Sequence, residues 1–479
     1  MRHKNILLIF TDQLRADLIA PIKDIGMQTP ALDRLARDSV IFDRCYTPSP
    51  VCVPARHSMN TGQYPARTGC NENTDTLPWD GWGLYQRLTD EGYRTHGIGK
   101  MHFPVRPYEN NGFESRDIQE ELSGGHDHYC QYLKDNGYGW VYDYNGQRSE
   151  MYYIPQNSPL PQKHHPSQWV GDRSVDFLLN YNEDRPFFLM SSFIHPHPPF
   201  APPIPWGKLY RSDVSAPFTP EGSGDLLTIL NLKQNQYKGL SVGIDKHLLA
   251  LTINYYRACV SFVDYQVGRI ITAMKEKGVY EDTLIIFTSD HGELLGDYNC
   301  FGKRTMLDAA CRIPFLVKCP DQNNRRISSP ASLVDAAPTV LSWAGIEYGP
   351  SEYDGVDLFN SDREYVYSQI LNGAMGLYMI ASSRDKLIYS KPDEKYYYFT
   401  KFPEERNIYN PGLPRCIELV DKLSAYINSD VAEPVNFDPA ALRVDLLKNP
   451  FRSIRQDHSY FRDREENAIP KGYRISWEY

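Results

Sequence analysis

Apolar residues occur along the chain in short, nearly continuous runs that end in polar residues. Three such runs cover residues 4–10, 187–193 and 283–289, and each is typical of a strand buried on both faces of a parallel sheet. Residues 93–98 are predicted as another short strand. Strand and helix signals alternate up to about residue 345. This alternation predicts an α/β fold in which helices sandwich a large doubly wound sheet, mixed but mostly parallel.

The hydrophobic pattern changes after residue 355. Short tyrosine-rich strands are predicted at 377–380, 386–389 and 396–399, followed by a helix at 416–427. We therefore expect a main domain of residues 1–350 and a smaller C-terminal α+β subdomain of residues 351–479 that includes a tail. Two stretches, at about 105–170 and 203–245, are expected as insertions near a pocket. The aromatic and amide side chains of the first suit a sugar, and they suit a packed loop equally well.

Polar side chains follow two of the predicted buried strands directly. Asp12 and Gln13 come after the first strand, and Asp290 and His291 come after the last. Open α/β sheets bind their ligands at the carboxyl ends of the strands. Two carboxylates with an amide oxygen and an imidazole beside them can enclose one divalent cation. The alternative for each acid alone is an ordinary helix N-cap.

The most informative motif begins at Cys52. Residues 52–62 have the spacing C-x-P-x-R-x-x-x-x-T-G, with Arg56 one helical turn after the thiol. This run resembles the signature of type I sulfatases of the alkaline phosphatase superfamily, in which the cysteine is oxidised to formylglycine. The resemblance implies an alkaline-phosphatase-like fold, with a small antiparallel sheet and a packed helix in the C-terminal subdomain. It also implies a sulfatase-maturing enzyme as a partner.

The chemistry of sulfate esters explains why this motif needs partners. The ester oxygens repel an incoming anion, so the site needs a strong nucleophile, surrounding cations and an acid for the departing alcohol. A hydrated aldehyde supplies one hydroxyl to attack sulfur and a second whose deprotonation expels sulfate. Arg56 is expected to stabilise the hydrate and a substrate oxygen. Cys52 on its own is also compatible with a small buried structural thiol.

The resemblance implies a role for further residues that lie in the family's order along the chain. Lys100 and His102 belong to a G-K-x-H element, His197 to a P-H-x-P-F element, and Lys303 precedes an R-I-P sequence. The implied metal ligands are Asp12, Gln13, Asp290, His291 and modified Cys52. The implied catalytic residues are Cys52, Arg56, Lys100, His102, His197 as the leaving-group acid, and Lys303. His195 is assigned to the pocket wall.

The metal-binding positions depart from the commonest sulfatase pattern. Many members have Asp-Asp and Asp-Asn where this chain has Asp12-Gln13 and Asp290-His291. Calcium is expected, with manganese or magnesium as alternatives. The same substitutions resemble phosphonate monoester hydrolases, so a phosphonate monoester or phosphodiester hydrolase is the rival enzyme. Lys100 and His102 favour a sulfate monoester. A non-catalytic sulfoglycan-binding protein is the alternative if Cys52 is never oxidised.

Net charge and cysteine content indicate which partners and which cellular compartment to expect. A formal charge of -9 argues against nucleic acid and favours a small sulfated substrate, most simply a saccharide. No apolar run approaches the roughly twenty residues that span a bilayer. The nine cysteines are scattered without C-x-x-C spacing, which favours reduced thiols. With no visible signal segment, we expect a cytoplasmic enzyme, or a periplasmic one if the chain has been shortened, and a homo-oligomer is compatible with this pattern.

Overall fold

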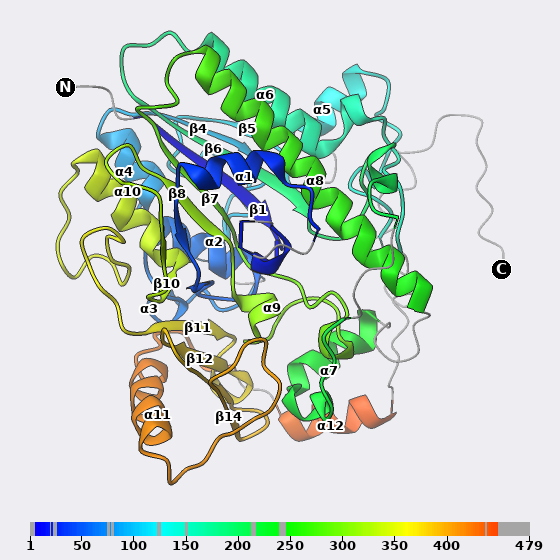
Figure 1. Ribbon diagram of the computed structural model, residues 1–479, viewed down its shortest axis with the longest axis vertical. Helices are drawn as coiled ribbons and strands as arrows, with labels where there is room; N and C mark the ends of the chain where they lie inside the picture. Colours follow the sequence, from blue (N-terminus) through cyan, green and yellow to red (C-terminus); the bar gives the residue numbers. More distant parts are fainter. Residues whose placement is uncertain are drawn as a thin grey trace.

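The computed structural model shows a large α/β body with a small sheet packed at one end (Figure 1). It describes residues 5–19, 21–22, 26–73, 77, 81–121, 126–148, 152–211, 217–238, 246–435 and 438–448. The part of the predicted tail after residue 448 therefore lies outside the described residues.

The main sheet has eight strands in the order β5-β4-β6-β1-β7-β8-β2-β9. Its five neighbouring strands from β5 to β7 are all parallel, and β8 pairs antiparallel with both β7 and β2. The mixed, mostly parallel sheet is as predicted. Its strands are β1 (Ile6–Asp12), β2 (Val40–Phe42), β4 (Arg94–Gly99), β5 (Ser115–Ile118), β6 (Phe187–Pro196), β7 (Leu284–Ser289), β8 (Phe315–Lys318) and β9 (Arg325–Ile327).

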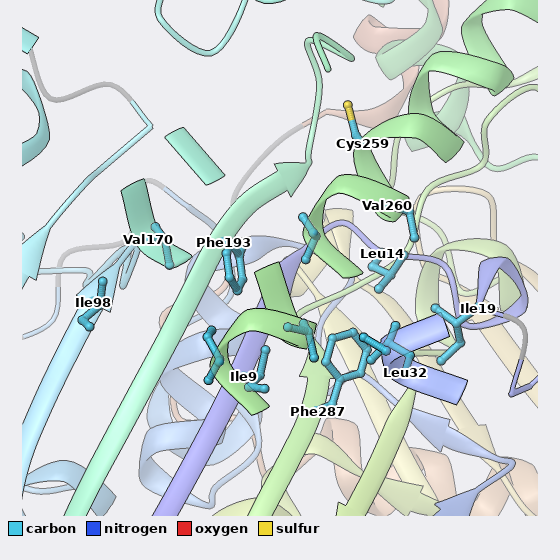
Figure 2. Close-up of a cluster of buried hydrophobic side chains, with 14 of the residues drawn as sticks. Ile9, Leu14, Ile19, Leu32, Ile98, Val170, Phe193, Cys259, Val260 and Phe287 are labelled. Atoms are coloured by element: carbon cyan, nitrogen blue, oxygen red, sulfur yellow. The ribbon is translucent and has the colours of Figure 1, made fainter. Parts of the chain in front are cut away.

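The central strands are apolar on both faces because each face has its own hydrophobic core. Along β1, Leu7 and Ile9 point into one cluster, whereas Ile6, Leu8 and Phe10 point into the other, as the period of two along a strand requires. Figure 2 shows Ile9 and its strand neighbours facing side chains of the helical layer. The continuous apolar runs in the sequence therefore arise from burial on two sides.

Helices cover both faces of the sheet. On one face α6 (Pro166–Asn180) and the long α8 (Lys246–Glu276) lie side by side, with α1 (Pro30–Arg37) packed on α8 (Figure 1). On the other face lie α2 (Cys52–Thr61), α4 (Leu84–Asp90) and α10 (Ala336–Ala344). Further helices are α3 (Pro65–Thr68), α5 (His128–Asp135), α7 (Ile229–Lys238), α9 (Asp308–Cys311) and α12 (Pro439–Lys448).

The C-terminal region forms the small antiparallel sheet that the resemblance implied. Its strands β11 (Val366–Ile370), β12 (Leu377–Ala381), β13 (Lys386–Ser390) and β14 (Lys395–Phe399) pair in chain order. Helix α11 (Pro414–Ile427) packs on β12 and β13. The other face of this sheet shares a hydrophobic cluster with residues 294–311 of the main body. A third, two-stranded sheet pairs β3 (Cys45–Tyr46) with β10 (Ala331–Ser332) in parallel.

Two details differ from the sequence prediction. Strand β5 lies inside the stretch 105–170, so part of this predicted insertion is an edge strand of the main sheet. Strand β11 was not predicted, because its alternating residues carry no long apolar run.

All nine cysteines are free and buried. Among the described helices, none combines the length and the apolar character needed to cross a membrane.

Candidate active site

The predicted site residues converge at the carboxyl ends of four neighbouring strands. Asp12 ends β1, Asp290 follows β7, Lys100 follows β4, and His195 lies near the end of β6. Since these strands are parallel neighbours, their carboxyl ends meet at one edge of the sheet. The order of the strands thus brings together side chains that are up to 278 residues apart in the chain.

Cys52 is placed at this edge by the start of helix α2. It is the first helical residue, and Val51 before it gives the helix no side-chain cap. The Cys52 Sγ atom lies 3.3 Å from His291 Nε2 and 3.8 Å from Asp12 Oδ1. Lys303 Nζ lies 2.8 Å from the same sulfur and 3.0 Å from His291 Nε2. The thiol is therefore surrounded by polar groups and is no ordinary core cysteine.

The charges around Cys52 change its protonation. Burial and the Asp12 carboxylate raise the pKa of the Cys52 thiol, but the positive charges of Lys303, Lys100 and His291 outweigh both and hold this pKa well below its usual value. The start of a helix also favours a negative charge. These charges therefore favour the thiolate form of an unmodified Cys52.

Four ligand atoms form a compact group at this point. One atom each from Asp12, Cys52, Asp290 and His291 lies within 4.8 Å of all the others, and all four residues are buried. Burial and the Asp12 charge raise the pKa of Asp290 against the effects of His291 and Arg56. Two buried carboxylates in one pocket are a costly arrangement that a cation relieves.

Gln13 completes the donor set in a specific orientation. Its backbone is left-handed, with φ 66°, and its side-chain nitrogen donates to the Glu293 carboxylate. Its Oε1 atom is buried without a hydrogen-bond partner. The backbone N–H of Gln13 donates to Asp290 Oδ1 at 2.9 Å, and a buried orphaned acceptor on the residue after Asp12 fits a cation ligand. Asp12, Gln13, Cys52, Asp290 and His291 are therefore the residues that would hold a divalent cation.

Arg56 contacts the metal-site carboxylates. Its guanidinium donates to Asp290 Oδ2 at 2.9 Å, to Asp12 Oδ2 at 3.2 Å and to the carbonyl of Lys100 at 2.7 Å. The guanidinium also donates a hydrogen bond to Ser192 Oγ at 3.1 Å. The buried guanidinium thus fixes both carboxylates and the start of the loop after β4. The predicted contact of Arg56 with a hydrated aldehyde stays a prediction.

A largely buried carboxylate, Glu121, links the two proton-carrying groups of the site. Its oxygens lie 2.7 Å from Lys100 Nζ and 3.5 Å from His197 Nδ1. Lys100 Nζ also lies 2.6 Å from Asp12 Oδ2. Burial raises the pKa of Glu121, but His197, Lys100 and Arg148 outweigh it and hold this pKa well below its usual value. Glu121 is therefore an anion between cations.

Two residues of the stretch 105–170, the basic Arg148 and the aromatic Tyr152, contact other residues of the site. Arg148 donates to Glu121 at 2.5 Å, and its guanidinium lies 5.5 Å from the centre of the Tyr152 ring. The Tyr152 and His197 rings meet edge to face at 6.2 Å. Arg148 and Tyr152 of this stretch thus contact Glu121 and His197 near the strand ends.

Two predicted site residues lie differently from the rest. His102 lines a cavity of about 220 Å³ together with Arg56 and Trp82, its φ is 54°, and its Nδ1 atom is buried without a partner. No contact between the His102 ring and Cys52 is found among the described residues. His195 lies 3.1 Å from Ser167 Oγ through Nδ1, and burial, followed by the charge of His197, lowers its pKa to about 3. His195 is thus a neutral group of the buried wall.

Sequence reasoning missed Glu121, Glu293, Arg148 and Tyr152. Glu293 had a usable signal, because it lies three residues after Asp290 at the same strand end. Glu121 follows β5, which lies inside the stretch predicted as an insertion. The other two lie in irregular chain, where no periodicity indicates which side chains face the site.

Comparison with known proteins identifies the family. A family model described as Sulfatase matches residues 4–346. The arylsulfatase of Clostridium perfringens is 27% identical over 442 residues, covering 84% of this chain and 89% of that protein. The N-acetylglucosamine-6-O-sulfatase of Bacteroides thetaiotaomicron is 25% identical over 416 residues, covering 74% and 70%.

A solved structure confirms the fold at greater length. The phosphonate monoester hydrolase of Agrobacterium radiobacter superposes with a TM-score of 0.75 at 21% identity, covering 89% of this chain and 96% of that one. This likeness confirms the alkaline-phosphatase-like architecture. The match to the family model includes the strand ends, the start of α2 and the loop that carries Lys303, and on this evidence the chain belongs to the sulfatase family.

Proposed function

We propose that this sulfatase hydrolyses the sulfate monoester of a small sugar with a formylglycine made from Cys52. The observation that carries the proposal is the position of Cys52 at the start of α2, within 3.3 Å of His291 and 2.8 Å of Lys303. A nucleophile between a metal-binding group and a buried ammonium has the partners that a sulfuryl centre requires. The hydrated aldehyde would supply the attacking hydroxyl and a second hydroxyl for release of sulfate.

The cationic side chains would bind and orient the sulfate oxygens. Lys303 already contacts the position of the nucleophile, and Lys100 lies beside Asp12. Both ammonium groups are buried, so their charges are only weakly screened by water. A divalent ion, which we expect to be calcium, would add Lewis-acid stabilisation of the same oxygens when bound.

His197 would protonate the departing alcohol. Its Nδ1 atom lies 2.7 Å from the carbonyl oxygen of Pro198, which can only accept, so Nδ1 carries the hydrogen and Nε2 is the nitrogen left for the substrate. The Glu121 carboxylate lies 3.5 Å from Nδ1, and the imidazolium is the form that can donate from Nε2. The aromatic ring of Tyr152 next to His197 is consistent with a sugar in the leaving-group position.

The position of Cys52 also indicates when a maturing enzyme would act. Its side chain is 1% exposed and lies under the loop that carries Lys303. An enzyme that oxidises this thiol would therefore have to act on the chain before the chain folds.

The decisive experiment is the mass of the tryptic peptide Cys45–Arg56 from protein made in a host that matures other sulfatases. Formylglycine at position 52, together with turnover of a sulfated sugar, would support the proposal. An intact thiol there would favour the non-catalytic sulfoglycan-binding protein.

Gln13 and His291 favour one second candidate, a phosphonate monoester or phosphodiester hydrolase. The test is the ratio of kcat/KM for 4-nitrophenyl sulfate to kcat/KM for 4-nitrophenyl phenylphosphonate. If Lys100 and Lys303 bind the oxygens of a compact sulfate group, kcat/KM should be higher for the sulfate than for the phosphonate. A preference for the phosphonate would assign the chain to the rival class.

A further inference from the structure

The donor group at Cys52 has a different chemistry before the thiol is oxidised. We propose that the unmodified chain binds a zinc-class divalent ion through the Cys52 sulfur, the His291 imidazole and two carboxylates. This inference concerns the chain as it is synthesised and does not rest on the proposed reaction.

The spacing of the donor atoms fits a zinc ion. Cys52 Sγ is 3.3 Å from His291 Nε2, and Asp12 Oδ1 is 3.8 Å from both of them. Asp290 Oδ1 is 3.6 Å from His291 Nε2. Tetrahedral zinc with bonds of about 2.0–2.3 Å places neighbouring donors about 3.3–3.6 Å apart. Shifts of a few tenths of an ångström would close the shell.

The chemical nature of the donors points the same way. A thiolate and an imidazole are preferred ligands of zinc and cobalt, whereas calcium takes six to eight oxygens. Cys52 and His291 are both fully enclosed, so neither is a surface group that collects ions by chance.

Lys303 is the group that opposes metal binding in the unmodified chain. Its ammonium lies 2.8 Å from Cys52 Sγ and 3.0 Å from His291 Nε2, the same two atoms that zinc would bind. An ion that enters the site must move this ammonium away. Replacement of Lys303 by an uncharged side chain of similar length should therefore strengthen metal binding.

The experiment uses the full chain made in a host without a maturing enzyme, with an intact Cys52 verified by peptide mass. Cobalt(II) chloride is added and the near-ultraviolet spectrum is recorded, because a cobalt–thiolate bond gives an intense charge-transfer band. Zinc and calcium chlorides are then titrated in competition. Cys52→Ser is compared with Cys259→Ser, which removes a buried thiol from the helical layer shown in Figure 2.

We expect the charge-transfer band in the wild type and in Cys259→Ser but not in Cys52→Ser. Zinc should displace cobalt, and a hundredfold excess of calcium should not. Changes beside a metal ligand alone cost about 10–100-fold in affinity, so loss of the ligand itself should weaken zinc binding at least about 100-fold. Lys303→Met should bind zinc more tightly than the wild type, and it tests the proposal even if Cys52→Ser fails to fold.

Three results would overturn the proposal. The first is a wild-type spectrum without the band, and the second is a band that persists in folded Cys52→Ser. The third is calcium that competes with cobalt as well as zinc does in the unmodified chain.

Discussion

Glu121 shows how one carboxylate can organise several groups of a site. It faces Lys100, His197 and Arg148 at 2.5–3.5 Å, so its negative charge opposes the mutual repulsion of Lys100 and Arg148 beside the His197 ring. It contacts neither Cys52 nor a proposed metal ligand directly in any described interaction. We therefore expect Glu121 to act as a positioning residue for the lysine and the acid.

Glu121→Gln should slow sulfates of poor leaving groups more than activated aryl sulfates. The amide keeps the shape of the side chain but removes the negative charge beside His197, the proposed general acid, and general acids contribute about 10²–10⁴-fold. A loss of about 10²-fold in kcat/KM is expected for a sugar sulfate, with a smaller loss for 4-nitrophenyl sulfate. Glu109→Gln, which changes an exposed partner of Arg106, is the control. Equal losses on both substrates would assign Glu121 a structural role only.

At the scale of the elements, the close contact between β4 and β6 fixes the position of Lys100. Gly99 has φ +90°, and a Cβ atom there would lie 1.9 Å from the carbonyl oxygen of Ser192. The next residue donates its backbone N–H to that same carbonyl at 3.2 Å. Only glycine allows the two strands to approach this closely.

Gly99→Ala should therefore destabilise the fold and displace Lys100. Strain at such a position costs about 1–3 kcal/mol, and the clash with backbone adds to it. Gly92→Ala is a matched control, because Gly92 has φ +84° with nothing within 4 Å of the added atom. Urea unfolding should show a clearly larger loss for Gly99→Ala. Similar losses in both variants would mean that β4 can move away from β6 at little cost.

The C-terminal sheet supports the loop that carries Lys303. Lys386 on β13 is fully buried and pairs with the carboxylate of Asp308 and with Glu404 at 2.7 Å. It also donates to the carbonyl of Met306 at 3.0 Å. These contacts tie the small sheet to the segment between Lys303 and α9.

Lys386→Met should lower both stability and activity. The variant leaves two carboxylates buried without their cation, and breaking a buried pair in this way costs about 3–5 kcal/mol. Lys395→Met changes a lysine of the same sheet whose amine bonds to a surface carbonyl, and it should cost little. The readouts are the urea midpoint and kcat/KM measured well below the melting temperature. Full activity in folded Lys386→Met would show that Lys303 is placed without help from the small sheet.

At the scale of the whole molecule, the sequence predicted the parts that depend on long apolar runs. Because β1, β6 and β7 are buried on both faces, their continuous apolar runs could be recognised as strands. Since the carboxyl ends of parallel strands meet at one edge of the sheet, Asp12 could then be expected beside Asp290. The family motif added Cys52 and Lys303, which the structure brings within 2.8 Å. Glu121 could not be predicted, because its partners come from distant elements and its own strand has no apolar run. His102 and Tyr152 lie in irregular chain, where tertiary packing alone sets the direction of a side chain.

Buried histidines should make the stability of the whole molecule depend on pH. His195 has its pKa lowered from 6.5 to about 3, first by burial and then by the charge of His197. Between these two values the unfolded chain binds a proton that folded His195 does not accept. The free energy of unfolding should therefore fall as the pH drops from 6.5 towards 3, by up to about 1.4 kcal/mol per pH unit for each such group.

His195→Gln should make this pH dependence less steep. The glutamine can still accept a hydrogen bond from Ser167 but takes up no proton in either state, so one proton disappears from the difference between unfolded and folded chain. Urea unfolding at pH 4.5, 5.5 and 7.5 measures the slope, with the exposed His247 replaced in a control variant. The free energy of unfolding of the variant should still depend on pH in part, because buried His165 also has its pKa lowered well below its usual value by burial and by His195. Parallel curves for wild type and His195→Gln would show that the His195 ring accepts a proton inside the folded protein, and the wall of the site would then carry charge in acid.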